Sequence, residues 1–123
     1  MDAALAATGS SLVPSAALAG GALTGKYAEG VAGRLTPELA DGRRIRELAL
    51  GAALRGPAER LQTTPATLAV AFTLRHPRTA STLVGATAPA QIDAALAAVV
   101  LAERLGPEEM AELRALAEGD GAP

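Results

Sequence analysis

The chain has no cysteine and no tryptophan among its 123 residues. The absence of cysteine excludes disulfides, thiol nucleophiles and zinc–thiolate sites. Other aromatic side chains are nearly absent as well, because Tyr27 and Phe72 are the only ones. The hydrophobic half of the sequence is mostly Ala, Leu and Val. Since small side chains bury little area each, we expect a thin core.

A strong charge of either sign is also missing, since the formal net charge is −2. This balance gives no electrostatic reason to expect nucleic acid or an anionic membrane as partner. The sequence has no signal-peptide pattern and no apolar run of about 18 residues, so we expect a soluble cytoplasmic protein. No Asp, Glu and His cluster has the spacing of a metal site, so no metal is predicted.

Helical patterns, one short strand-like run and a glycine-rich loop make up the first half of the chain. The patterns predict a helix over 2–8 that ends at Gly9, a strand over 11–17, a glycine-rich loop over 18–35, a helix over 38–55 that breaks at Gly56-Pro57, and a short helical turn over 58–62. Arg43, Arg44 and Arg46 are interpreted as a solvated face of the 38–55 helix.

The second half begins with a clear helix start, Thr64 at the N-cap and Pro65 at the first helical position. The predicted elements are a helix over 66–75, a strand over 79–84 closed by Gly85, a helix over 90–100 opened by Pro89, a helix over 107–118, and a disordered tail over 119–123. The order strand, loop, helices, strand, helix, helix predicts an α/β fold with a parallel strand pair. We expect a single domain over residues 1–118.

The stretch LAGGALTGKY at 18–27 is the most informative motif. Read as Gly20, four residues, Gly25 and Lys26, it approaches a nucleotide P-loop. A P-loop needs Ser or Thr after the lysine to hold Mg²⁺, but the next residue is Tyr27. The glycines downstream predict a loop where a P-loop requires a helix. This motif therefore does not support an NTPase.

Four segments together resemble the C-terminal portion of an aldo-keto reductase, of the bacterial type similar to potassium-channel β subunits. They are LAGGALTGKY at 18–27, TPATLAVAFTLRHP at 64–77, STLVGATAPAQI at 81–92 and LGPEEMAEL at 105–113. The resemblance implies a partial (β/α)8 TIM-barrel remnant comprising the last two βα units. Two strands cannot close such a barrel, and their unpaired edges are a liability. We therefore expect a homo-oligomer or pairing with a complementary barrel fragment.

The resemblance also implies residues that contact the phosphates of NADP(H). Glycines let the backbone approach phosphate, and a lysine ammonium attracts it. The residues implied are Leu18, Gly20, Gly21 and Lys26 for the pyrophosphate, Arg34 for the adenine or 2′-phosphate, and Gly85, Thr87 and Gln91 in the loop after the second strand. The helix start at Pro89 would add N–H groups that favour anions.

Other positions depart from the family pattern. Ser15 stands where relatives have the aromatic residue that stacks on nicotinamide, and Ala94-Ala95 replaces the Glu-Asn pair that holds the adenine. The resemblance also assigns the catalytic Asp, Tyr, Lys and His to segments upstream of residue 1. His76, the only histidine, falls at the wrong end of its strand for barrel chemistry, so we expect a structural or solvent-facing role.

The resemblance therefore implies a truncated protein that retains weak NADP(H) phosphate binding and is not a carbonyl reductase by itself. Two alternatives remain open. One is an interaction module that oligomerises through the barrel remnant. The other is a non-redox enzyme, such as a cyclase or isomerase, with Ser15, Thr24, Lys26 and Tyr27 as the candidate groups for a small-molecule ligand.

Overall fold

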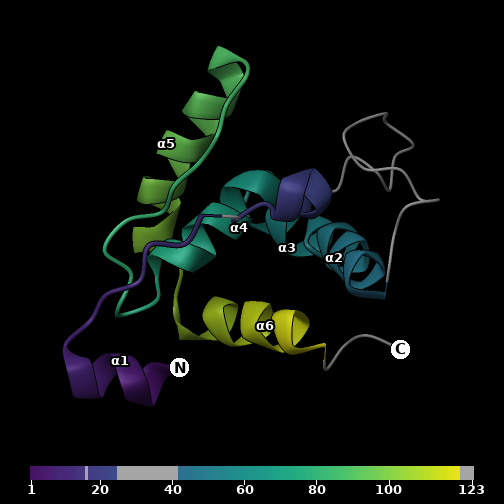
Figure 1. The fold of residues 1–123 in the computed structure, drawn as a ribbon. Helices are drawn as coiled ribbons and strands as arrows, with labels where there is room; N and C mark the ends of the chain where they lie inside the picture. The colour runs from purple at the N-terminus through teal and green to yellow at the C-terminus, as the bar shows by residue number, and fades with distance from the viewer. Residues whose placement is uncertain (16, 25–41, 120–123) are drawn as a thin grey trace.

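The computed structural model describes residues 1–15, 17–24 and 42–119 (Figure 1). The described part is rich in helix, as predicted. Its elements are α1 (Asp2–Thr8), the 3-10 helix η1 (Ala19–Thr24), α2 (Gly42–Ala53), α3 (Arg55–Arg60), α4 (Pro65–Leu74), α5 (Pro89–Arg104) and α6 (Pro107–Glu118). None of these described helices is both long enough and apolar enough to cross a membrane.

Capping residues set several helix ends where the sequence predicted them. Gly9 ends α1 in the left-handed conformation, with φ of 68°. The Thr64 hydroxyl accepts the Thr67 backbone N–H at 3.2 Å, and Pro65 opens α4. At the start of α6, the Glu109 carboxylate accepts the backbone N–H of Gly106 at 3.0 Å. These local signals were sufficient because each cap satisfies backbone groups within its own turn.

Other predicted boundaries were wrong. The helix predicted over 38–55 ends at Ala53. Gly56 and Pro57, where the sequence predicted a break, lie within a separate helix, α3. Pro57 fits because it lies in the first turn of α3, where a backbone N–H has no helical partner. The helix predicted to end at residue 100 continues to Arg104. Residues 38–41 and 120–123 lie outside the described part.

The predicted parallel strand pair is reduced to one parallel bridge between Leu12 and Thr79, and the described residues form no strand. The Leu12 N–H donates to the Arg78 carbonyl at 2.7 Å, and the Ala80 N–H donates to the Leu12 carbonyl at 2.9 Å. A regular ladder would continue through an N–H at position 14. Because Pro14 has none, the ladder stops there.

The next hydrogen bond between the two segments is out of register with a parallel ladder. The Pro14 carbonyl accepts from the Leu83 N–H at 2.8 Å, one residue later than a continuous ladder requires. The two segments therefore stay side by side and parallel without becoming strands. The predicted direction was right, but the predicted strands over 11–17 and 79–84 were not.

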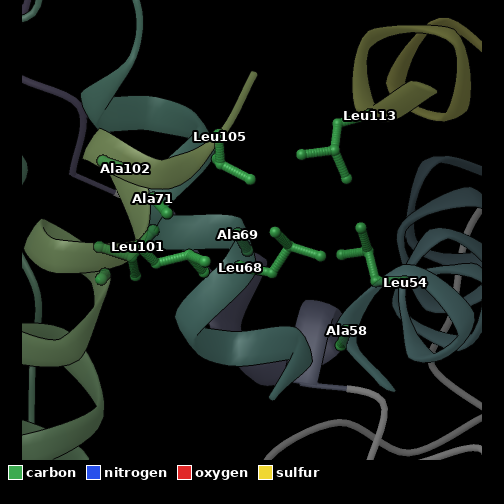
Figure 2. Close-up of a cluster of buried hydrophobic side chains, with 11 residues drawn as sticks. Leu54, Ala58, Leu68, Ala69, Ala71, Leu101, Ala102, Leu105 and Leu113 are labelled. Atoms are coloured by element: carbon green, nitrogen blue, oxygen red, sulfur yellow. The ribbon is translucent and has the colours of Figure 1, made fainter. Parts of the chain in front are cut away.

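The core lies around α4, which is apolar on all sides. Figure 2 shows Leu54, Leu68 and Leu113 pointing toward a common space from the α2–α3 junction, α4 and α6. The buried cluster consists of Leu54, Ala58, Leu68, Ala69, Val70, Ala71, Ala98, Leu101, Ala102, Leu105 and Leu113. It contains no aromatic side chain, and Phe72 packs against it only partly buried. The expectation that Ala, Leu and Val form the core is confirmed.

One polar side chain is buried in this core. Thr67 of α4 is 4% exposed, and its hydroxyl donates to the Ala94 carbonyl of α5 at 3.1 Å. The bond satisfies the hydroxyl, which would otherwise be costly to bury. It also ties together α4 and α5, the two helices that pack most extensively on each other.

Candidate functional site

Six of the eight residues implied for phosphate binding, all except Lys26 and Arg34, fall in two turns, at 18–24 and 85–91, that follow the two bridged segments. Because the Leu12–Thr79 bridge is parallel, both segments run in the same direction. Both turns therefore follow the carboxyl-terminal end of a bridged segment, although Figure 1 shows the start of α5, where the second turn lies, well away from η1. The carboxyl end of the strands is where barrel enzymes bind ligands.

The first turn is more regular than predicted. Residues 19–24 form η1, where the sequence predicted part of a glycine-rich loop. The Leu18 carbonyl accepts the N–H groups of Gly21 at 2.9 Å and Leu23 at 3.1 Å. Gly21 has φ of 102°, a conformation that side chains disfavour, and Gly20 lies one residue before it in η1. The bond from Gly21 to Leu18 spans three residues, as in a 3-10 helix, so local bonding accounts for the start of η1.

Helix α2 holds η1 in position through two contacts that sequence reasoning missed. The Arg44 guanidinium donates to the Ala19 carbonyl at 2.7 Å, so Arg44 is not part of a purely solvated face. At Gly51, α2 meets the backbone of Ala22 so closely that an added Cβ would lie 2.1 Å from the Ala22 oxygen. An isolated glycine within a helical pattern was the one signal that could have indicated this contact.

The second turn is closed by a side chain at the start of α5. The Gln91 side-chain oxygen accepts the Thr87 backbone N–H at 2.6 Å, the Thr87 hydroxyl at 3.3 Å and the Ala88 N–H at 3.3 Å. Thr87 and Gln91, both implied to contact phosphate, therefore contact each other. Gly85 is exposed, and an added Cβ there would meet no atom within 4 Å. A phosphate at this turn would replace the Gln91 oxygen as acceptor.

The two positively charged residues implied for phosphate binding are not part of the described turns. Lys26 and Arg34, together with Tyr27, fall outside the described residues. Of the other groups named for a non-redox enzyme, Ser15 is exposed and the Thr24 hydroxyl donates to the Gly21 carbonyl at 2.7 Å. The structure thus describes the backbone part of the implied phosphate site and none of its charged part.

His76 connects two elements instead of facing either turn. Its Nδ1 accepts the Arg78 backbone N–H at 3.0 Å, and its Nε2 lies 3.0 Å from the Asp2 carboxylate. Because Nδ1 accepts a hydrogen bond, the ring proton belongs on Nε2, which donates to Asp2. These bonds link the start of α1 to the segment after α4 and are consistent with a structural role.

A separate depression lies between α3 and α6, with a volume of about 300 Å³. Its lining is formed by Arg60, Leu61, Glu108, Glu109 and Glu112. Arg60 donates to both carboxylate oxygens of Glu112, at 2.6 and 2.5 Å. The remaining charge in the lining is negative, which disfavours a phosphate. In the described ranges, no three His, Asp or Glu residues are grouped as metal ligands.

Two parallel segments, each followed by a turn and helices, correspond to the βα unit from which α/β barrels are built. In agreement with this, a model of the aldo/keto reductase family matches residues 2–118. The chain belongs to the aldo/keto reductase family. No curated protein matches it in a sequence search. The family match supports the resemblance and its (β/α)8 barrel relationship, although the described part contains one bridge in place of strands.

Proposed function

We propose that this chain supplies the cofactor-phosphate end of an aldo/keto reductase barrel. In this proposal the 18–24 turn, together with Lys26, binds the pyrophosphate of NADP(H), and the 85–91 turn binds its 2′-phosphate. The observation that carries it is the parallel Leu12–Thr79 bridge, since both turns follow the carboxyl-terminal end of a bridged segment. The segments quoted above further suggest the branch of the family similar to potassium-channel β subunits.

The two turns differ in how they would bind phosphate. At the first, Gly20 and Gly21 leave the backbone open to close approach, and Lys26 would add a positive charge. At the second, the Thr87 N–H, the Thr87 hydroxyl and the Ala88 N–H converge on one oxygen of Gln91. Donors that converge on one oxygen acceptor are suited to a phosphate oxygen in its place.

Binding through phosphate alone would be weak. Ser15 offers no ring for stacking on nicotinamide. Ala94 and Ala95 offer no polar side chain for adenine, and the Ala94 carbonyl already accepts the Thr67 hydroxyl. Most of the affinity would come from charge and backbone N–H groups, so it should fall as salt is added.

Carbonyl reduction would require the Asp, Tyr, Lys and His that the resemblance assigns upstream of residue 1. The one histidine in the sequence, His76, is engaged with Asp2 and Arg78. We therefore propose that the chain does not reduce carbonyls by itself, and that a complementary barrel fragment would have to supply these groups.

Replacing Lys26 with alanine should lower the affinity for NADPH several-fold, because the ammonium proposed to attract the pyrophosphate is removed. Isothermal titration calorimetry of the full chain at low salt measures this directly. The same loss is expected for NADH, which carries the same pyrophosphate. If the unaltered chain binds no NADPH under these conditions, the proposed function is wrong.

Replacing Thr87 with valine tests the proposed 2′-phosphate contact independently of the pyrophosphate contact. The variant keeps the backbone N–H of residue 87 and loses the hydroxyl proposed to bind the 2′-phosphate. NADPH affinity should fall about three- to tenfold, the value of one hydrogen bond, while NADH affinity stays unchanged. Equal losses for both nucleotides would contradict the assignment of this turn to the 2′-phosphate.

A further inference from the structure

Ala19, the first residue of η1, has a backbone conformation that alanine disfavours. Its φ is 51°, in the left-handed region. This region is costly for a residue with a Cβ, because the Cβ comes close to a backbone carbonyl oxygen. Glycine adopts the region freely, yet the two glycines of the turn, Gly20 and Gly21, follow Ala19. A contact from the surrounding structure is therefore required to hold Ala19 in this conformation.

Helix α2 supplies this contact as a hydrogen bond. The Arg44 guanidinium donates to the Ala19 carbonyl at 2.7 Å, although 25 positions separate the two residues in the chain. Because the donor is charged, the bond is stronger than one between neutral groups. It fixes the direction of the Ala19 carbonyl, and with it the plane of the peptide bond to Gly20. In a trans peptide the carbonyl and the N–H point in opposite directions, so the Gly20 N–H is directed away from Arg44.

Arg44 is itself held in place on α2. Glu47, one turn further along the helix, accepts hydrogen bonds from both Arg44 and Arg43. The Arg44 side chain is 35% exposed, whereas that of Arg43 is 81% exposed. Gly51 brings the same helix against the backbone of Ala22. Helix α2 therefore fixes η1 at two points, and Arg44 acts on the residue that precedes the glycines.

We propose that Arg44 is a positioning residue for the 18–24 turn, which it prepares for the pyrophosphate by keeping Ala19 in the left-handed conformation. This role rests on the proposed function, because it assumes that the turn binds the pyrophosphate. Without Arg44, Ala19 leaves the left-handed region in most molecules, and the Gly20 N–H changes direction. Only the remaining fraction binds, so the apparent dissociation constant rises as that fraction falls.

Calorimetric titration of the full chain with NADPH and with NADH at low salt tests this role. Arg44→Ala should weaken the binding of both nucleotides about tenfold, because both carry the pyrophosphate. The matched control is Arg46→Ala, which removes the same charge from an exposed position on α2. It should change either affinity by less than about twofold, since exposed charges are screened. Unchanged affinity in Arg44→Ala, or equal losses in both variants, would overturn the proposal.

A second substitution distinguishes positioning from direct attraction of phosphate by the Arg44 charge. Glycine adopts positive φ about as readily as negative φ, so Ala19→Gly should make Arg44 largely dispensable. The double variant Arg44→Ala, Ala19→Gly should bind both nucleotides within about threefold of the wild-type affinity. Direct attraction by the Arg44 charge would not be restored by a change at residue 19. Failure of the double variant to recover affinity would therefore contradict the positioning role.

Hydrogen exchange followed by NMR tests the turn without nucleotide. The N–H groups of Gly21 and Leu23 both donate to the Leu18 carbonyl, so their exchange rates report whether the turn is formed. Both rates should rise about tenfold in Arg44→Ala and return to within about threefold of wild type in the double variant. Circular dichroism confirms that each variant is folded.

Unchanged exchange in Arg44→Ala would show that Arg44 does not hold the turn, whatever the nucleotide affinities are. A wild-type chain that binds no NADPH, with exchange rates that respond as expected, would overturn the proposed function and leave the effect of Arg44 on the turn standing. The two failures are therefore distinguishable.

Discussion

Replacing Gly51 with alanine is expected to lower the free energy of unfolding by about 1–3 kcal/mol, the usual cost of overpacking. The new Cβ would lie 2.1 Å from the Ala22 carbonyl oxygen, and 3.1 Å from its carbon. Both atoms belong to the backbone, so no side-chain rotation can relieve the clash. Either α2 or η1 must move, which also disturbs the 18–24 turn.

This result would be the opposite of what helix propensity predicts. Alanine is favoured over glycine inside a helix by about 1 kcal/mol, so an unconstrained position would gain stability. Gly56→Ala in α3 is the matched control, because its Cβ would meet only the Arg60 side chain, at 3.9 Å. Urea unfolding followed by circular dichroism measures both variants. A Gly51→Ala protein as stable as Gly56→Ala would show that α2 and η1 do not pack this closely.

Replacing Leu68 with alanine should cost about 3–5 kcal/mol of unfolding free energy. Leu68 is fully buried, with 0% exposure, at the centre of α4. Its neighbours include Ala58, Ala69 and Ala71, whose short side chains cannot extend into the space it leaves. Since small domains are stable by only about 5–15 kcal/mol, the loss should leave the protein close to unfolding.

Ile45→Ala provides the control for this truncation. Ile45 has a similar volume but is 58% exposed on α2, so its removal should change the unfolding free energy by less than about 0.5 kcal/mol. The difference between the two variants, measured by urea unfolding, isolates the contribution of burial. If Leu68→Ala is as mild as Ile45→Ala, the core is not organised around α4.

The sequence was a good guide where the determining groups are neighbours in the chain. The Thr64 hydroxyl and the Thr67 N–H are three residues apart, as are Gly106 and Glu109, so their caps could be predicted from spacing. It was a poor guide at Gly56-Pro57. The same dipeptide is compatible with a break or with a first helical turn, and packing around the buried Pro57 and Ala58 selects the latter.

The same distinction between local and long-range contacts applies to the candidate site. Gly20, Gly21 and Thr87 were implied by the family resemblance and remain predictions, and Lys26 and Arg34 lie outside the described residues. The anchoring of η1 by Arg44 was not predictable, because that residue is 25 positions from Ala19 and nothing local links them. The bonds between Thr87 and Gln91 span only four residues, so they are local, but the sequence analysis did not predict them.

By itself, the sequence determined the family, the order of the α-helices and the caps of α1, α4 and α6. The caps could be predicted because each depends on residues close together in the chain. Tertiary structure alone decided that the expected strands become a single bridge and that η1 is seated against Gly51. These features depend on which distant backbone and side-chain groups meet, and no local spacing specifies that.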